Sequence, residues 1–267
     1  MSLPFVNNYT PPKPCSNPDP EAVLASREPY DINFSFPLHL DTLACPTVRL
    51  TPFVPTLHAR TFWEPIGTQA RELFKYYPFR LDTLAHFLSA VETRRQHPDN
   101  CVFAIFDRTR RPDGADSEDG RLAGVMALIN TSMQHMNTEI GLVVVLPAFQ
   151  GTHVARTALG LLLRYCLQTP AASPPGLGLR RVRWSAHPRN KPSIGLAKRM
   201  GFREEGILRW TFVIPDVEEM KREARVLERE GEEGWGRDSV CLAICWDDWD
   251  NGAGATVESL LQQPLVA

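Results

Sequence analysis

Apolar and polar residues alternate along several stretches of the chain, a pattern typical of half-buried β-strands. In the stretch RRVRWSA, for example, Val182, Trp184 and Ala186 alternate with polar residues. The apolar stretch EIGLVVVL indicates a central strand, which Pro147 ends because proline cannot donate a ladder hydrogen bond. The pattern predicts strands at residues 47–53, 101–106, 121–130, 139–146, 180–186, 205–214 and 238–246.

Between these strands, apolar residues recur every three to four positions, as on one face of an α-helix. Two such segments follow the first strand, and another begins directly after the central strand. Gly201 suits the left-handed position just past the end of a helix, and a strongly charged segment before the last strand also shows helical spacing. The pattern predicts helices at residues 56–77, 81–95, 155–166, 192–200 and 217–229.

The two ends of the chain lack this periodicity. Residues 1–45 are rich in proline, asparagine and serine, so we expect an extended or disordered N-terminal arm. Residues 250–267 are predicted to form an unpatterned C-terminal tail. One uninterrupted series of elements lies between them, which predicts a single domain at 46–249 with a helical insertion at about 216–230.

The charge of the chain restricts its partners. Its 267 residues carry a formal net charge of -2, with acidic and basic residues interleaved. We therefore expect no basic face for nucleic acid or an anionic membrane surface, and a small or locally docked substrate is favoured. The N-terminus lacks the features of a signal peptide, and no stretch approaches the roughly 20 apolar residues that span a bilayer. These features predict a cytoplasmic protein.

The cysteines lie mostly within apolar stretches rather than in paired CxxC spacing. They suit small buried hydrophobic residues in a reducing compartment. Cys241 and Cys245 could be taken for metal ligands. Alternation, however, puts both on one face of a strand, and no histidine partner lies nearby in the sequence. Strand packing is the favoured interpretation, and no metal site is expected.

The segment 139–155, EIGLVVVLPAFQGTHVA, carries the strongest chemical signal in the sequence. An apolar strand leads through a short polar turn into the first turn of a helix. Such a turn attracts phosphate, because free backbone N–H groups and the positive end of the helix dipole converge on one point. An ordinary helix start is the alternative for this turn when it is taken alone.

A second segment, HPRNKPSIGLAKRMGFREEG at 187–206, strengthens the phosphate interpretation. Together the two segments resemble the cofactor-binding motifs of the GCN5-related N-acetyltransferases (the GNAT superfamily), and the element order resembles their RimJ/RimL-type branch. The resemblance covers roughly residues 46–248. It implies an α+β (mixed α/β) fold: a central, mostly antiparallel sheet of six to seven strands, with the fourth and fifth strands splayed apart and helices on its flanks.

The resemblance also implies acetyl-CoA as co-substrate. In the family the turn reads Gln or Arg, two variable residues, Gly, one variable residue, then Gly or Ala; here His153 replaces the central glycine. Histidine keeps its N–H and can adopt right-handed helical angles, but its Cβ disfavours a positive φ, so we expect a slightly altered loop that still binds. The implied cofactor-binding residues are Val143, Val145, Gln150, Gly151, Thr152, His153, Val154, Ala155, Arg156, Asn190 and Ser193.

Several of these residues have a structural alternative. The side-chain amide of Asn190 matches the family position that bonds the pantetheine chain, yet Asn190 and Ser193 can also cap the following helix. Arg156 suits a contact with phosphate and equally a solvated helix face. Val143 and Val145 are implied to offer backbone groups to the pantetheine arm, while their side chains suit the core. One extra residue in the first motif, relative to the common family form, suggests a displaced β-bulge.

Acetyl transfer needs a neutral amine, a polarised carbonyl and a proton for the departing thiolate. Glu139 matches the family's EIG motif, where a carboxylate can accept the ammonium proton directly or through water; a strand-edge glutamate is the alternative. The helix end at 200–202 has no hydroxyl where the family often has a tyrosine. Ser193 is therefore the candidate general acid, with helix capping as its alternative.

The predicted function is acetyl-CoA-dependent N-acetylation of a primary amine, in a small molecule or at a protein N-terminus, by direct attack in a ternary complex. By family analogy the acceptor cleft is lined by aromatic residues that suit core packing as well, namely Trp63, Tyr76, Tyr77, Phe79 and the loop 133–137. The rival hypotheses are a noncatalytic acyl-CoA-binding module and a protein-interaction scaffold. The scaffold hypothesis uses the predicted helix at 217–229 and the Pro-rich arm. A solvated strut is the default interpretation of this helix, which could also close over the acceptor cleft or extend a homodimer contact.

Overall fold

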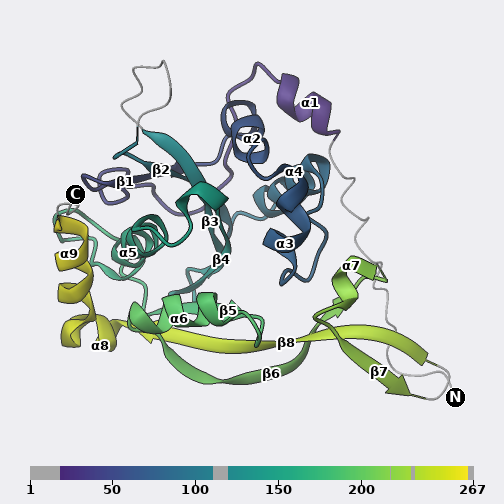
Figure 1. Ribbon diagram of the computed structural model, residues 1–267. Helices are drawn as coiled ribbons and strands as arrows, with labels where there is room; N and C mark the ends of the chain where they lie inside the picture. Colours follow the sequence, from purple (N-terminus) through teal and green to yellow (C-terminus); the bar gives the residue numbers. More distant parts are fainter. Residues whose placement is uncertain (1–18, 111–119, 217, 230–231, 264–267) are drawn as a thin grey trace, which may run out of the picture.

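A mixed β-sheet forms the centre of the protein (Figure 1). The computed structural model describes residues 19–110, 120–216, 218–229 and 232–263. In these ranges the strands pair in the order β1-β2-β3-β4-β5-β8-β6, β7 pairs with β8, and only β4 and β5 run parallel. The strands are β1 (Val48–Pro52), β2 (Cys101–Asp107), β3 (Arg121–Ser132), β4 (Asn137–Val145), β5 (Arg181–Ala186), β6 (Arg203–Ile214), β7 (Arg225–Arg229) and β8 (Glu232–Cys245). The predicted α+β fold is confirmed, with an 8-stranded sheet rather than six to seven strands.

Helices cover both faces of the sheet. Helix α2 contacts β3 and α4 contacts β2, whereas α5 contacts β1, β2, β4 and β5; Figure 1 shows the two groups on opposite sides. Every residue of β2 except Phe106 is buried, as expected for a strand covered on both faces. The helices are α1 (Pro20–Ala25), α2 (Pro55–Trp63), α3 (Ala70–Phe74), α4 (Leu84–Arg95), α5 (Val154–Leu167), α6 (Lys191–Arg199), α7 (Glu218–Lys221), α8 (Trp246–Asp248) and α9 (Gly254–Gln262). Across the described ranges, no helix has the length and apolar character needed to cross a bilayer.

Helix α5 is buried along most of its length, because the sheet lies on one side of it and α9 on the other. Gly160 lets α9 approach closely: a Cβ at this position would lie 3.3 Å from Leu261 and 3.4 Å from Val257. This packing fixes the position of α5. It therefore also fixes where the first turn of α5 points.

The segment that precedes β1 is tied to α5 by hydrogen bonds. The guanidinium of Arg164 donates to the carbonyls of Thr42, at 2.7 Å, and Ala44, at 2.9 Å. The hydroxyl of Tyr165 donates to the carbonyl of Pro37 at 2.7 Å. The described part of the predicted N-terminal arm thus packs against the domain, and residues 1–18 lie outside the described residues.

Strands β4 and β5 pair at one end only and then separate. Their register ends with Ile140 opposite Trp184. Beyond this point β4 carries a bulge, in which Leu142 and Val143 together oppose the single residue Met126 of β3. Leu142 adopts a φ of 46° at the bulge. The extra residue of the first motif is accommodated here, at the start of the splayed segment.

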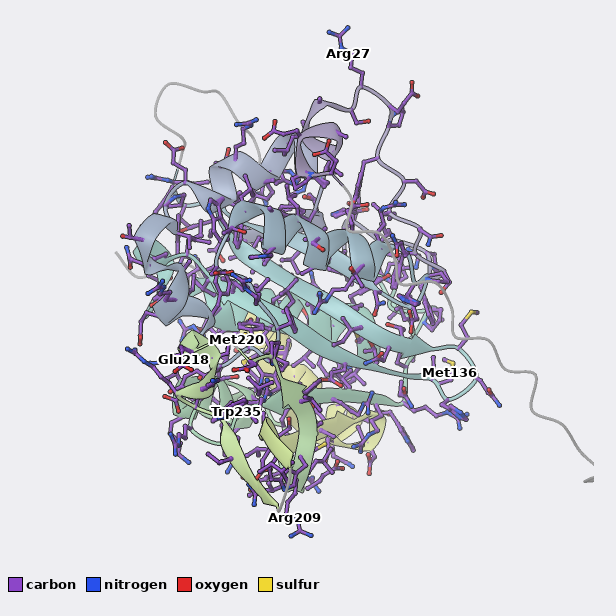
Figure 2. The ribbon with its side chains drawn as sticks, turned by 90° about the vertical axis from the view of Figure 1, so that its right-hand side faces the viewer. Arg27, Met136, Arg209, Glu218, Met220 and Trp235 are labelled. Carbon is purple, nitrogen blue, oxygen red and sulfur yellow. The ribbon has the colours of Figure 1, made fainter. Side chains whose placement is uncertain are left out.

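The helix predicted at 217–229 is wrong. Helix α7 has only 4 residues, and the chain then forms β7, in which Val226 pairs with Trp235 of β8. Apolar residues at helical spacing pair across strands here, a long-range interaction that a local pattern cannot reveal. Figure 2 shows Trp235, Met220 and Glu218 gathered at this end of the molecule. The insertion is therefore an extension of the sheet, and residue 217 lies outside the described residues.

The predicted unpatterned C-terminal tail is also wrong. The chain leaves β8 at Trp246 to form α8, and α9 then buries Val257 and Leu261 against α5. The glycines at the start of this segment hide the helical spacing of the apolar residues that follow. Residues 264–267 lie outside the described residues.

Candidate active site

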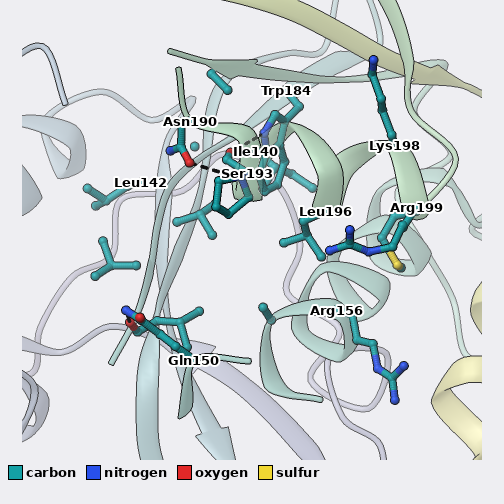
Figure 3. A pocket seen from close by; sticks show the side chains of 18 of the residues that line it. Ile140, Leu142, Gln150, Arg156, Trp184, Asn190, Ser193, Leu196, Lys198 and Arg199 are labelled. Carbon is teal, nitrogen blue, oxygen red and sulfur yellow. Dashed lines mark hydrogen bonds between the residues drawn. The ribbon is translucent and has the colours of Figure 1, made fainter. Parts of the chain in front are cut away.

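A large cavity opens where β4 and β5 separate (Figure 3). It has a volume of about 1800 Å³ and is walled by β4, β5, the first turn of α5, α6 and part of α9. Its other end reaches β8 and the segment after α3. Figure 3 shows Asn190 and Ser193 of the second motif on one side, and Gln150 and Arg156 of the first motif on the other. The cavity therefore joins the two motifs.

The turn after β4 presents backbone amides to this cavity. Gly151 adopts a φ of 72°, in the left-handed region that glycine tolerates best. The first backbone bond within α5 runs from the N–H of Thr157 to the carbonyl of His153. The N–H groups of Ala155 and Arg156 therefore have no partner within the helix, and both residues line the cavity. This is the arrangement that the phosphate interpretation predicts.

Two side chains of the turn stabilise the turn itself. The Gln150 amide donates to the carbonyl of Val145 at 3.1 Å. The Thr152 hydroxyl donates to the carbonyl of Phe149 at 2.6 Å and accepts from the amide of Val154 at 3.3 Å. Val154 is fully buried and does not line the cavity, unlike the other predicted residues of the turn. The side chain of Val154 therefore packs in the core, and its contact with a cofactor stays a prediction.

His153 replaces the family's glycine in a right-handed conformation, with φ -65° and ψ -24°. Its Nε2 lies 3.5 Å from Oδ1 of Asp107, a fully buried residue at the end of β2. Neither His153 Nε2 nor Asp107 Oδ2 has a hydrogen-bond partner among the described residues. The imidazole thus faces a buried carboxylate, and the backbone meets the steric requirement of its Cβ as predicted.

The β4 edge beside the cavity is held by a tyrosine. The Tyr77 hydroxyl donates to the carbonyl of Val143 at 2.8 Å. Burial raises the pKa of Tyr77 above its ordinary value, so the phenol stays protonated and remains a donor. Val143 and Val145 are half-buried and both line the cavity. A ligand that pairs with this edge must share these carbonyls with Tyr77 and Gln150.

Asn190 and Ser193 both line the cavity and both take part in capping α6. Oδ1 of Asn190 accepts from the amide of Ser193 at 3.3 Å, a bond that leaves the side-chain NH₂ group of Asn190 unused by the cap. The indole of Trp184 donates to the Ser193 hydroxyl at 3.0 Å. Because indole can only donate, the hydroxyl accepts, and its own hydrogen is available for another partner. The two roles proposed for each residue are therefore compatible.

Glu139 lies on β4 opposite Arg183 of β5. Its carboxylate is 3.5 Å from Nη2 of Arg183, and its side chain is 15% exposed. Glu139 is not part of the cavity wall, which begins at the next residue, Ile140. The carboxylate therefore reaches the cavity only through water or after a change of rotamer.

Cations lie at the end of the cavity near α9, and of these only Arg156 was predicted from the sequence. Lys198 and Arg199 also line this end, and Lys198 forms an ion pair with Glu204 at 2.8 Å. Figure 3 shows Arg199 beside Leu196, with Arg156 below them in the same view. The spacing on α6 could have identified Arg199. Arg199 follows Leu196 by three residues, so both lie on the same face of the helix, and Leu196 is on the cavity wall.

The opposite end of the cavity is aromatic and basic. Tyr76 stacks on His187 with ring centroids 5.1 Å apart, and Arg237 of β8 lines the same wall. His187 Nδ1 accepts from the amide of Arg189, and Nε2 lies 2.9 Å from the carbonyl of Glu223. Burial lowers the pKa of His187, which favours the neutral ring. His187 therefore shapes the wall, with both nitrogens already engaged.

The residues predicted to line the acceptor cleft do not all lie on one cavity. Tyr76 and Tyr77 line the cavity. Trp63 instead stacks within the aromatic core, and Phe79 lines a separate cavity of about 440 Å³. The loop 133–137 joins β3 to β4 and is not part of the cavity wall. Trp63 therefore packs in the core, which is the alternative given above for the aromatic residues of this set.

Cys245, Asp247 and Asp248 have potential metal-ligand atoms within 4.8 Å of one another. Asp248, however, accepts a hydrogen bond from the amide of Cys245 at 3.1 Å and forms an ion pair with Arg203. These contacts cap α8. Helix capping therefore accounts for this cluster, which lies outside the cavity wall.

Several solved acetyltransferases share this fold. A GCN5-related N-acetyltransferase from Brucella melitensis is 23% identical with a TM-score of 0.62, covering 82% of this chain and 84% of that chain. Mycobacterium smegmatis RimJ, solved in complex with CoA-disulfide, is 21% identical with a TM-score of 0.56, covering 79% and 88%. Spermidine N-acetyltransferase from Vibrio cholerae, solved with CoA and spermine, is 17% identical with a TM-score of 0.53, covering 77% and 99%. The class of fold is that of an N-acetyltransferase.

Residues 47–203 match the family model of the acetyltransferase (GNAT) domain. The match spans more than half of the chain, so the protein belongs to the GNAT acetyltransferase family. A search of curated proteins found no match. The matched range contains the first motif and most of the second, the two segments that carry the resemblance in the sequence.

Proposed function

We propose that the protein transfers an acetyl group from acetyl-CoA to a primary amine by direct attack in a ternary complex. The observation that carries the proposal is the set of free amides at the first turn of α5 beside the open edge of β4. A diphosphate and an amide-rich arm need these two features side by side. RimJ and the spermidine N-acetyltransferase were both solved with a CoA species, which supports the same donor here.

The donor-binding roles follow from the contacts of each residue. Gly151, Ala155 and Arg156 offer amides to the diphosphate, while Gln150, Thr152 and His153 shape the turn around it. The free NH₂ group of Asn190 and the backbone of Val143 and Val145 bind the pantetheine arm. Arg156 and Arg199 attract the phosphates electrostatically, since both are exposed on the cavity wall.

The chemical step moves one acetyl group and one proton. The amine nitrogen attacks the thioester carbonyl, a C–N bond forms, the C–S bond breaks, and the sulfur leaves as a thiolate. We assign removal of the amine proton to Glu139 acting through water, because its carboxylate lies just off the cavity wall. We assign proton delivery to the thiolate to Ser193, whose hydroxyl hydrogen is left free by the Trp184 indole and whose oxygen regains a proton from water.

A binding measurement beside a turnover measurement tests this function against its rivals. Calorimetry with acetyl-CoA should show binding, and a thiol-release assay should show CoA release that depends on an added amine. Binding without amine-dependent release would favour a noncatalytic acyl-CoA-binding module. Absence of binding would remove both hypotheses and leave a protein-interaction scaffold.

We expect Glu139→Gln to lower the acetylation rate most at low pH, where the acceptor is protonated and must lose a proton before it attacks. Acetyl-CoA affinity should be nearly unchanged, because Glu139 does not line the cavity. A matched control is Arg183→Met, which removes the ion-pair partner at 3.5 Å and keeps the carboxylate. Equal pH–rate profiles for Glu139→Gln and the wild type would exclude Glu139 from the mechanism.

We expect His153→Gly to keep acetyl-CoA affinity within about threefold of the wild type, since a glycine at a helix N-cap changes stability by only a few tenths of a kcal/mol. The backbone amide is retained, and the imidazole faces Asp107. His153→Asn, which keeps a polar side chain, serves as the control. Calorimetry that gave an affinity loss above about tenfold for both variants (1.4 kcal/mol) would mean that the imidazole itself contacts phosphate.

We also assign the protein to the RimJ/RimL-type branch of the family. The support is the order of elements, with helices α2 to α4 between β1 and β2, together with the EIG sequence at the start of the first motif. RimJ is among the similar structures. Assignment to this branch describes ancestry and does not specify the acceptor, which must be inferred from the residues of the cavity.

A further inference from the structure

Arg237 is a buried cation at the acceptor end of the cavity. It lies on β8, is 7% exposed and lines the cavity wall. Its guanidinium donates only to neutral oxygens: Nη1 to the carbonyl of Tyr76 at 2.9 Å, Nη2 to the hydroxyl of Ser239 at 3.4 Å, and Nε to the carbonyl of Asp238 at 3.3 Å. Among the described residues, no carboxylate lies within ion-pair distance of it. A guanidinium has five N–H donors, so one remains on each terminal nitrogen.

The acidic residues of this region are already paired elsewhere. Glu139 pairs with Arg183, Glu223 pairs with Arg189, and Glu72 pairs with Lys75. Burial lowers the pKa of Arg237, and the more distant negative charge of Glu139 opposes this change only in part. A buried cation without a counter-ion is unfavourable, and an anion from solution or substrate would stabilise it. The acceptor end of the cavity is therefore electrostatically suited to an anionic group.

The position of Arg237 ties it to the reaction centre. Its partner Tyr76 is followed directly by Tyr77, whose hydroxyl holds the β4 carbonyl at the bulge where the two strands separate. An anion bound at Arg237 thus lies on the acceptor side of this point. The planar guanidinium fork matches a carboxylate in geometry as well as charge.

We propose that Arg237 binds the carboxylate of the acceptor, so that the acceptor is a small amino-carboxylate such as a free amino acid. This inference rests on the proposed acetyl transfer and narrows its acceptor. A polyamine, the ligand of the similar Vibrio cholerae structure, carries only positive charge and is repelled by this cation. A peptide N-terminus without a nearby carboxylate leaves the guanidinium unpaired.

The test compares acceptors that differ only in the carboxylate. The thiol-release assay is run with acetyl-CoA and glycine, alanine or phenylalanine, with the amide of each, and with spermidine. For the wild type we expect kcat/KM for at least one amino acid to exceed that for its amide by at least about 30-fold, because removing one partner of a buried, hydrogen-bonded charge pair costs 2 kcal/mol or more. Spermidine should be a poorer acceptor than that amino acid.

Two variants separate recognition from structure. Arg237→Gln keeps a donor for the Tyr76 carbonyl and removes the charged fork, so the ratio of acid to amide should fall to near one, while acetyl-CoA affinity stays within about threefold (under 1 kcal/mol). Arg94→Gln is the control: Arg94 is a half-buried arginine, but it lines the separate cavity beside Phe79 and should leave the ratio unchanged. A merely structural role for Arg237 would lower both activities together and leave the ratio intact.

The outcomes separate failure of this inference from failure of the proposed function. Amides or spermidine used as well as amino acids by the wild type would overturn the inference and keep the acetyltransferase. A preserved ratio in Arg237→Gln would overturn it as well. Acetyl-CoA binding with no CoA release for any amine would overturn the proposed function itself.

Discussion

Acetyl-CoA binding should weaken about tenfold or more when Gly151 is replaced by alanine. Gly151 has a φ of 72°, and a Cβ there would have no atom within 4 Å, so the substitution causes no clash. The cost is conformational, about 1–2 kcal/mol for a non-glycine residue in the left-handed region. We expect the turn to relieve that strain by rotating its backbone, which would turn the amides away from the proposed phosphate site. The dissociation constant from calorimetry measures the effect.

Gly206→Ala is the matched control for this prediction. Gly206 also has a positive φ, 151°, with no atom within 4 Å of an added Cβ, but it lies on β6 outside the cavity wall. It should lower the free energy of unfolding and leave acetyl-CoA affinity unchanged. Equal affinity losses in the two variants would show that the effect of Gly151→Ala comes from general destabilisation rather than from the turn.

Arg164→Ala should lower the free energy of unfolding by about 3 kcal/mol, the scale for removing one partner of a buried charged network. Arg164 is buried on α5 and donates to the carbonyls of Thr42 and Ala44. Without it, these carbonyls lose their charged donor and the segment before β1 loses its attachment to α5. Chemical denaturation measures the loss, and limited proteolysis should cleave within residues 37–45 faster than in the wild type.

Glu258→Ala separates the ion pair from the carbonyl contacts. Glu258 lies 3.5 Å from Nη1 of Arg164, and its side chain is 32% exposed. Because a partly exposed pair contributes little, this variant should lose less than about 1 kcal/mol. A loss as large as that of Arg164→Ala would mean that the ion pair to α9, and not the bonds to the N-terminal segment, carries the stability.

Local signals are sufficient to predict the turn after β4 and the cap of α6, which both lie on the cavity wall. Pro147 ends β4, Gly151 takes the positive φ of the turn, and Asn190 caps α6, all through interactions within a few residues. Such signals can be read from a sequence because they depend on residues that are close together along the chain. The strand–turn–helix order, and the cavity that it opens, follow from the same signals.

Long-range contacts account for what the sequence does not predict. Arg237 donates to Tyr76, which lies 161 positions away in the chain, so nothing near Arg237 marks it as part of a cavity. The pairing of Val226 with Trp235 is likewise a contact between strands, and the helical spacing of apolar residues in this segment does not reveal it. Glu139 combines both kinds of information. Its EIG motif can be read from the local sequence, but its ion pair with Arg183 depends on the parallel register of β4 and β5 and cannot.

Helix α5 joins parts of the protein that are far apart in the chain. Its first turn forms the proposed phosphate site, while its later turns hold the N-terminal segment through Arg164 and Tyr165 and pack against α9 through Gly160. A ligand that orders the start of this helix should therefore slow hydrogen exchange at residues 37–45 and in α9 together. Residues 37–45 and α9 would then form one cooperative unit, and their hydrogen exchange would show whether a ligand occupies the cavity at the first turn of α5.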